Sequence, residues 1–416
     1  MQLNIVANKY VKMLFIISIS IYLLFIFIGS HVRSSGDDAS YLSVFNSHHI
    51  INTLAWRYHK WSGRLAIEWV MVATIGYSLF WKVGIPLSVC VVCYSCCRIS
   101  GVRCNVLSFS FALFLFAVIP YDINSDASWW VAGFYNYLLP VSASIYVFSI
   151  LFCGESNKIE KILCILLSFY FPYMEQVGVA FVMAMVFWSI QKRKSLSVFD
   201  IIVMVVVCVN LIICLKAPGN RNRFILEVWN WYPQYQTYGI TNRIALGFDK
   251  LHQLMTFRYN MPLIFFIILL FVTRSLYGKM TYSIKFSMFI VATFISLSVG
   301  NALTGLFSSG YFFNPSMLSA ERWCVFELYI SYMYIFFVIS SVITILFDCC
   351  VNKITRMVPF FAMIIGFFTV VMLGLSPTVY ASGYRVDFIF EISCIISCVS
   401  LISSLENVRC VKVDFQ

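Results

Sequence analysis

The stretch Met13–Gly29, MLFIISISIYLLFIFIG, decides the fold class of this chain. It carries no charge and approaches the length of about 20 residues with which a helix crosses a bilayer. Its apolar residues are continuous rather than alternating, which favours a helix over a barrel strand. Lys9 and Lys12 precede it, as in a signal peptide. The run is longer than the roughly 7–15 apolar residues of such a peptide, and no A-x-A site follows, so we expect a retained signal anchor.

The composition extends this interpretation to the whole chain. Of the 416 residues, 61% are hydrophobic and only 11% are charged, whereas soluble domains carry roughly 25% charged residues. A soluble enzyme is therefore excluded. The net charge of +11 does not indicate a nucleic-acid partner, because no basic block stands apart from the apolar runs.

Further apolar runs predict an all-α fold: a single integral membrane domain (1–416) forming a polytopic transmembrane helical bundle of about 10–12 spans. The candidate spans are 13–29, 83–97, 105–120, 138–153, 161–173, 176–190, 199–215, 261–273, 283–300, 324–347, 357–375 and 387–405. The runs 161–173 and 261–273 are short, so they extend into flanking residues or re-enter. The stretch 65–81 is predicted to lie at the interface as a helix, with a full span as the alternative.

Lysines and arginines near the span ends place the N-terminus in the cytoplasm. Every short turn on that side carries at least two basic residues. The opposite side receives the long segments 30–82, 121–137, 216–260, 301–323 and 376–386, which contain all five histidines. Long polar segments of this kind are where function concentrates.

Fifteen cysteines do not predict a disulfide framework, since most lie within the apolar runs. Cys90, Cys93, Cys96 and Cys97 have a metal-like spacing, but inside such a run they are expected to be small packing residues. No metal site is predicted, and dependence on a divalent cation is left open.

Two adjacent carboxylates, Asp37 and Asp38, follow the first span. An ionised carboxylate there can take a proton from an attacking sugar hydroxyl, as a general base. Neighbouring residues on extended chain point to opposite sides, so one acts while the other supports it. The alternative is a solvated Gly-Asp-Asp turn.

Aromatic residues and arginines gather in the same outer segments. Trp61 and Arg64 end the first loop, where an indole can stack on a sugar and a guanidinium can hold phosphate. Trp129, Trp130 and Asn136 lie in the second loop. The alternative is an aromatic belt at the interface, with arginines reaching to the headgroups.

Other charged candidates lie between spans. Glu175 stands in a short hairpin at membrane depth, where an ionisable residue is a functional candidate or the partner of an outer arginine. Arg221 and Arg223 follow a Pro-Gly turn and are predicted to clamp phosphate, or else to meet lipid headgroups. Arg322 and Arg385 each adjoin an aromatic residue and are further phosphate candidates.

The sequence contains no Walker loop, no G-x-G-x-x-G after a strand, no H-E-x-x-H and no G-x-S-x-G. A sugar transferase acting outside the cytoplasm therefore needs a lipid-linked donor, because nucleotide sugars do not reach that side.

Five motifs of the outer segments occur in a characteristic order. They are Asp37-Asp38, Trp61-Ser62-Gly63-Arg64, the Trp129…Gly133…Asn136-Tyr137…Pro140 loop, Glu175-Gln176 and Ala217-Pro218-Gly219-Asn220…Arg223. Together they resemble the Gtr-type serotype-converting O-antigen glucosyltransferases encoded by temperate phages of enteric bacteria. The resemblance runs to about residue 390. Some members carry a longer outer C-terminal tail, which this chain lacks.

The resemblance implies a GT-C-like fold in the bacterial inner membrane, with a periplasmic active site. Glucose would pass from undecaprenyl phosphate glucose to a sugar of the lipid-linked O-antigen repeat, with inversion. The implied companions are a donor synthase and a small flippase. By the same resemblance, Asp37 or Asp38 would be the base, and Arg64, Arg221 and Arg223 would bind the donor phosphate. Trp61, Trp129 and Trp130 would stack on sugar, and Asn136 is a further sugar-binding candidate. Glu175 would orient a hydroxyl or an arginine.

Two other classes compete. A transporter or flippase of lipid-linked sugars shares the many spans, but it predicts paired broken helices and charges near the midplane. An O-antigen polymerase is a second enzyme alternative. A membrane acyltransferase predicts a histidine at depth, and the predicted spans contain none.

Overall fold

The computed structural model describes residues 2–47, 49–154, 156–192, 196–257, 259–305, 307 and 326–413. Over these residues the chain is all-α, and the only extended pairing is an isolated bridge between His31 and Trp130. The predicted helical class is therefore confirmed.

The helices of the N-terminal half are α1 (Gln2–Gly29), α2 (Asp37–Ser47), α3 (Ile50–Lys60), α4 (Leu65–Thr74), α5 (Ser78–Ile99), α6 (Val106–Ala117), α7 (Tyr121–Asn124), η1 (Ser125–Trp129), α8 (Val131–Gly133), η2 (Phe134–Leu138), α9 (Leu139–Cys153), α10 (Lys158–Ser168), η3 (Phe171–Tyr173) and α11 (Glu175–Lys192). Those of the C-terminal half are α12 (Val198–Leu215), α13 (Pro218–Trp231), η4 (Pro233–Thr237), α14 (Ile240–Thr256), α15 (Met261–Ser275), α16 (Tyr282–Thr304), α17 (Phe326–Val351), α18 (Val358–Val371), η7 (Met372–Leu375), η8 (Arg385–Asp387) and α19 (Phe388–Val413).

Eight stretches of helix in the described residues are long and apolar enough to cross a membrane. They are Lys9–Gly29, Ser78–Ile99, Val131–Cys153, Val198–Leu215, Tyr282–Thr304, Leu328–Val351, Val358–Leu375 and Arg385–Leu405. Each contains most of one predicted span. The chain is thus a polytopic membrane protein.

The four remaining predicted spans are not simple crossings. The run 105–120 forms α6, which meets the helix Tyr121–Trp129 at a bend of 95°, and α15 meets α14 at 79°. Counting each bent pair as one span raises the total to 10. The run 161–173 forms most of α10 and then the short helix η3. The 11 residues of α10 extend roughly 16 Å, and α11 is a shorter apolar helix.

Two further differences concern segments between spans. The predicted loop 121–137 is helical, and its last part is continuous with α9. The predicted interfacial stretch 65–81 is divided, because α4 ends at Thr74 and Ser78 already opens α5. The reason is packing: Trp81 is buried and donates its indole N–H to the carbonyl of Ile75, which fixes the turn between the two helices.

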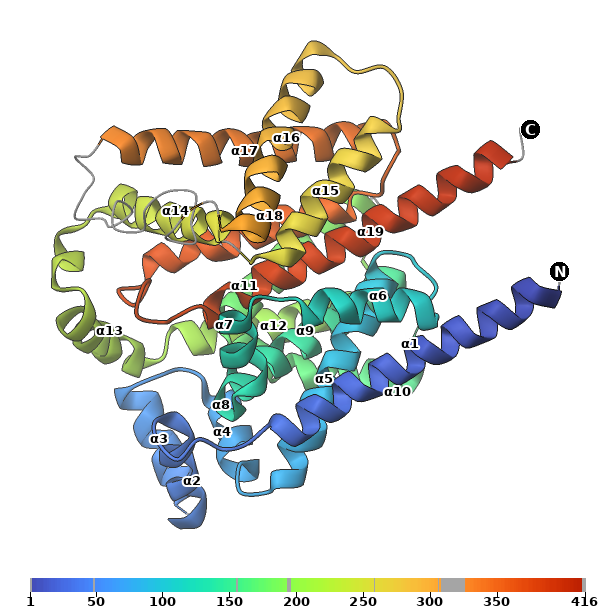
Figure 1. Cartoon of the computed structure of the whole chain (residues 1–416). Coiled ribbons are helices and arrows are strands. Elements are labelled where there is room, and N and C mark those ends of the chain that lie inside the picture. Colours follow the sequence, from blue (N-terminus) through green and yellow to red (C-terminus); the bar gives the residue numbers. More distant parts are fainter. Residues whose placement is uncertain are drawn as a thin grey trace.

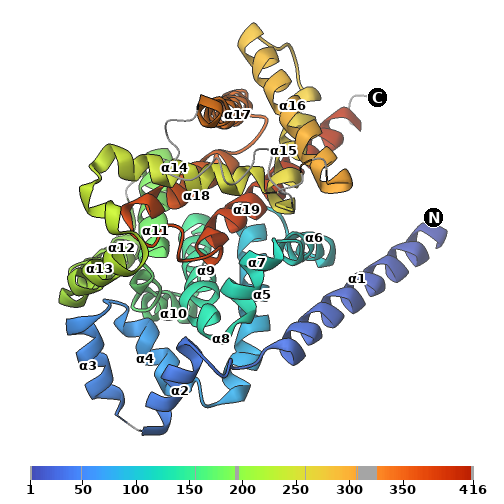
Figure 2. The ribbon, with the colours of Figure 1, turned by 60° about the vertical axis from the view of Figure 1, so that its left-hand side comes forward.

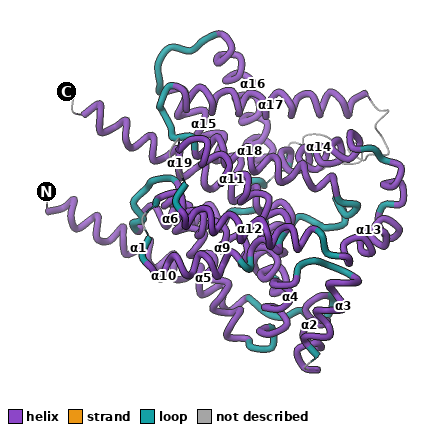
Figure 3. Tube along the Cα trace, turned by 180° about the vertical axis from the view of Figure 1, so that it is seen from behind, coloured by secondary structure: helices purple, strands orange, loops and turns teal. Residues whose placement is uncertain are grey.

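Most of α19 is buried, and it packs against α5, α6, α15 and α18 as the central helix of the bundle. By contrast, α1 exposes nearly its whole apolar surface, as a lipid-facing span does. The ends of α1 and α19 that carry the two termini lie at the same side of the molecule (Figures 1 and 3).

Helices α2, α3 and α4 lie together away from the termini, and α13 packs on α3 (Figure 2). All four belong to segments predicted to be outside the cytoplasm. Cys93, Cys96 and Cys97, in α5, are fully buried packing residues, and the described cysteines form no disulfide.

Candidate functional site

A polar cavity of about 450 Å³ opens among segments that are far apart in the sequence. Its walls come from α2, the end of α3, α4, the short helices α8 and η2 (residues 130–137), α13 and the segment 378–385. The lining residues are Asp37, Tyr41, Arg57, Trp61, Ser62, Arg64, Glu68, Trp130, Ala132, Asn136, Tyr137, Arg223, Glu227, Asn230, Trp231, Thr378, Ala381, Ser382 and Arg385. The cavity thus joins four of the predicted outer segments.

Many of the residues singled out from the sequence meet in this cavity. Asp37, Trp61, Arg64, Trp130, Asn136, Arg223 and Arg385 all line it. Because these residues come from five separate parts of the chain, their meeting is a property of the fold and not of any one motif.

The adjacent carboxylates separate into two environments. Asp37 is exposed at the start of α2 and lines the cavity. Asp38 is fully buried and accepts hydrogen bonds from the backbone N–H groups of Arg33, at 2.8 Å, and Ala132, at 2.9 Å. Burial raises the pKa of the Asp38 carboxyl, although these two N–H groups and Arg33 oppose the rise. Asp38 thereby connects the start of α2 to α8, which contains Ala132.

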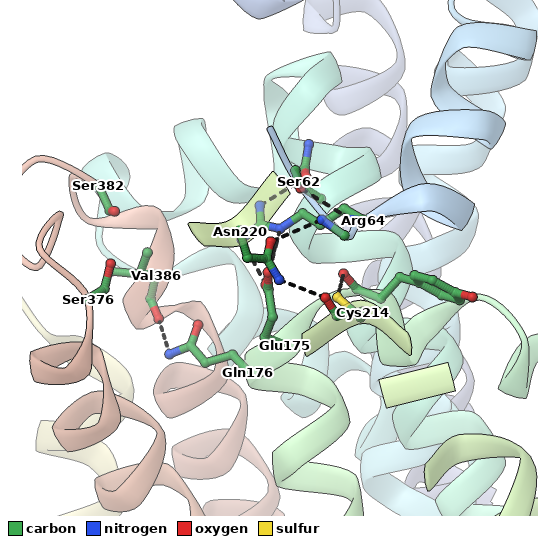
Figure 4. A network of polar contacts seen from close by, with 12 residues as sticks. Ser62, Arg64, Glu175, Gln176, Cys214, Asn220, Ser376, Ser382 and Val386 are labelled. Carbon is green, nitrogen blue, oxygen red and sulfur yellow. Dashed lines mark hydrogen bonds and ion pairs between the residues drawn. The ribbon is translucent and has the colours of Figure 1, made fainter. Parts of the chain in front are cut away.

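Arg64 and Glu175 form an ion pair just behind the cavity wall (Figure 4). The Nη2 and Nε atoms of Arg64 lie 2.9 and 3.1 Å from Oε2 of Glu175. The remaining Nη1 donates to Oδ1 of Asn136 at 3.4 Å. Asn136 donates in turn to the carbonyl of Ala132 at 2.8 Å. Glu175 therefore holds the guanidinium of Arg64, which in turn contacts Asn136, a sugar-binding candidate. Orienting an arginine is one of the two roles expected for Glu175.

Two glycine-containing segments pack closely beside this pair: the loop with Gly63 and the start of α13 with Gly219. The backbone N–H of Gly63 donates to Oδ1 of Asn220 at 3.1 Å, and Nδ2 of Asn220 donates to the carbonyl of Cys214 at 2.8 Å (Figure 4). A Cβ on Gly63 would lie 2.0 Å from that carbonyl oxygen, and one on Gly219 would lie 2.4 Å from the backbone nitrogen of Trp61. Only glycine permits this approach, which fixes α13 against the end of α3.

We expect Gly219→Ala to lower the stability of the folded protein by about 1–3 kcal/mol or more, because the new methyl group meets rigid backbone atoms. The midpoint of thermal unfolding in detergent measures the loss. Gly300→Ala is the matched control, since a Cβ there meets nothing within 4 Å. Equal melting of the two variants would contradict the close packing of these two segments.

Two more arginines of the cavity have carboxylate partners. Arg57 contacts Glu68 with two nitrogens at 2.8 Å each, and Nε of Arg223 lies 2.6 Å from Glu227. Arg385 differs. Its Nε donates to the carbonyl of Ser382 at 3.1 Å, and its guanidinium lies 5.1 Å from the centre of the Trp130 ring. Among the described residues that line the cavity, it is the arginine without a carboxylate partner.

Sequence reasoning missed the residues that hold Arg385 in place. Lys250, on α14, lies 3.3 Å from Asp387 and donates to the carbonyl of Gly383 at 3.3 Å. Asp249, its neighbour, accepts hydrogen bonds of 2.5 Å each from Tyr332 and Tyr380. This pair of residues therefore binds both ends of the segment 380–387. The signal available in the sequence was an adjacent acid and base inside an amphipathic stretch.

The other predicted residues lie elsewhere. Trp129 packs at 6.3 Å from Phe25 and 5.7 Å from Tyr121, between ring centres, and does not line the cavity. Arg221 is exposed at the start of α13, outside the lining. Arg322 falls outside the described residues. No group of three His, Cys, Asp or Glu side chains in the described residues has the arrangement of a metal site.

Comparison of the chain with protein-family models, with curated proteins and with solved structures gave no match.

Proposed function

We propose that this membrane protein transfers glucose from undecaprenyl phosphate glucose to a sugar of the lipid-linked O-antigen repeat, on the periplasmic face of a bacterial inner membrane. The observation that carries the proposal is that Asp37, an exposed carboxylate, and Arg385, an arginine without a carboxylate partner, line one cavity together with aromatic side chains.

The charges of the cavity suit a phosphodiester donor. Three of its arginines are neutralised by Glu68, Glu175 and Glu227. These arginines help to form the cavity wall but add no net positive charge to it. Arg385 remains to attract an anion. As the bond from glucose to phosphate breaks, negative charge grows on the phosphate oxygens, and a guanidinium already in place stabilises it.

The carboxylate of Asp37 supplies the base for a single displacement. It takes the proton of the acceptor hydroxyl, whose oxygen forms a bond to the anomeric carbon of glucose. The bond from that carbon to the phosphate oxygen breaks, and its electron pair leaves on undecaprenyl phosphate. One base is sufficient for this inverting reaction, and the aromatic rings of Trp61 and Trp130 offer faces for sugar stacking.

An apolar cavity of about 120 Å³ between α9, α11, α18 and α19 suits part of the polyprenyl chain. Val141, Val177 and Ile389 line it, and each lies within five residues of Asn136, Glu175 or Arg385 on the same stretch of helix. A donor held by its phosphate at the polar cavity would extend its tail along these helices.

The test is expression with the donor synthase and flippase in a host that makes a defined O-antigen, followed by linkage analysis. Glucose branches are expected with the intact protein. Arg385→Ala should reduce branching at least tenfold, and Arg221→Ala, an exposed arginine outside the cavity lining, should leave it unchanged. Absence of branches in every acceptor background would overturn the proposal.

A transporter of lipid-linked sugars is the second candidate, and two observations favour it. The helix pairs bent by 95° and 79° resemble the discontinuous helices of transporters. The buried Lys250 and Asp387 place charge inside the bundle. Reconstitution into liposomes separates the candidates: a transporter moves undecaprenyl phosphate glucose between leaflets without acceptor, whereas the transferase forms glycan product only.

A further inference from the structure

One face of α13 turns toward the polar cavity, and the opposite side exposes several large apolar residues. Arg223, Glu227, Asn230 and Trp231 all line the cavity, and their spacing of four, three and one residues places them on one side of the helix. Ile225, Leu226 and Trp229 are exposed outside the lining. Helix α13 therefore has a surface side and a cavity side.

The helix is fixed in this orientation from two directions. Val228 is buried in a small cluster with Tyr235 and Leu246, separate from the main core. At the other end, Gly219 lies against the backbone of Trp61, as described above. The cavity side of α13 is thus a built wall.

The chemistry of this wall differs from that around Arg385. Glu227 neutralises Arg223 at 2.6 Å, and the guanidinium of Arg223 lies 5.9 Å from the centre of the Trp61 ring. What faces the cavity is then two indoles, an amide and a paired carboxylate. A phosphate finds no free positive charge here, whereas a neutral pyranose finds aromatic faces for its C–H groups and polar partners for its hydroxyls.

We infer that the α13 wall, where Asn230 and Trp231 line the same cavity as Trp61, is the subsite for a neutral hexopyranose unit of the acceptor glycan. This inference rests on the proposed function and deepens it, since it assigns acceptor and donor phosphate to separate walls of one cavity. Trp231 is 64% exposed, which leaves its ring available for stacking.

The competing explanation for Trp231 is an anchor at the membrane interface, where tryptophan is common. Trp229 provides the matched control, because it lies two residues earlier on α13, is 79% exposed and does not line the cavity. An anchoring role makes the two tryptophans equivalent, whereas a glycan subsite distinguishes them.

The test uses the full-length protein in detergent with two measurements. The first is saturation-transfer NMR with the delipidated repeat-unit oligosaccharide of the host O-antigen, without donor. The second is the steady-state kinetics of transfer. Trp231→Ala is expected to lose the NMR signal and to raise the KM for acceptor about tenfold, with the KM for donor unchanged. Trp229→Ala is expected to match the unmodified protein.

The outcomes separate the two proposals. Glycan binding that depends on Trp231, without any transfer product, would support the subsite and refute the transferase. Transfer with equal acceptor KM in Trp231→Ala, Trp229→Ala and the unmodified protein would overturn the subsite alone. Equal losses in both variants would assign Trp231 to the interface, and absence of both binding and transfer would overturn both proposals.

Discussion

Asp37→Asn is expected to lower the rate of glucose transfer by about 10²–10⁴-fold, the usual contribution of a general base. The side chain keeps its shape but loses its ability to accept a proton from the attacking hydroxyl. Asp37 has no hydrogen bond or ion pair to its side chain among the described residues, and it is exposed at the cavity. Its replacement should therefore leave the fold unchanged.

Asp38→Asn should have the opposite phenotype. Both carboxylate oxygens of Asp38 accept backbone N–H groups, from Arg33 and from Ala132. An asparagine satisfies one of them and turns its own N–H₂ group toward the other, inside a fully buried site. Leaving that donor unsatisfied costs about 1–3 kcal/mol. We expect a lower unfolding midpoint and less folded protein.

The two effects are measured by a transfer assay normalised to folded protein, together with thermal unfolding in detergent. Asp122→Asn is the control, because Asp122 is an exposed acid on the predicted outer side that does not line the cavity. Full transfer by folded Asp37→Asn protein would remove the base from the mechanism. Loss of transfer by Asp38→Asn without any loss of stability would move the base to Asp38.

The spans were predictable to different degrees for a physical reason. Apolar runs such as 13–29 and 199–215 favour lipid over water, and without water in the bilayer their backbone must form a helix, whatever they pack against. The geometry of the runs 105–120 and 261–273 depends on their neighbours. Each forms one arm of a bent pair, and packing sets that angle. A hydropathy pattern does not contain this information.

The candidate site divides in the same way. Asp37, Arg64 and Arg385 were recognisable because polar groups beside spans have few structural reasons to be there. The sequence indicated that Glu175 could pair with an outer arginine, but it did not say which one. The contacts of Arg64 with Glu175 and of Gly63 with Asn220 join residues more than 100 positions apart, and only the folded chain decides them. Lys250 was missed because a charge in a predicted outer loop is ordinary until its burial is known.

Lys250→Met is expected to cause the largest loss of stability, about 3–5 kcal/mol, which is the usual effect of removing one partner of a buried ion pair. The side chains of Lys250 and Asp387 are only 5% and 1% exposed. Without the ammonium group, the Asp387 carboxyl has no ion-pair partner in surroundings that solvate a charge poorly, and the carbonyl of Gly383 loses its donor. The segment that carries Arg385 is then released from α14.

A double-mutant cycle tests this pairing. Asp387→Asn in the Lys250→Met background replaces the carboxyl that has lost its partner by a neutral amide, so the double variant should be more stable than Lys250→Met alone. Both Lys250→Met and the double variant should have a higher KM for the donor than the unmodified protein. The reason is that in each of them the segment 380–387 has lost the ammonium group that positions Arg385. Lys285→Met, at an exposed lysine without an ion pair in the described residues, should change neither quantity. Additive losses in the cycle would show that Lys250 and Asp387 do not act as a pair, and a normal donor KM in the double variant would separate this ion pair from the placement of Arg385.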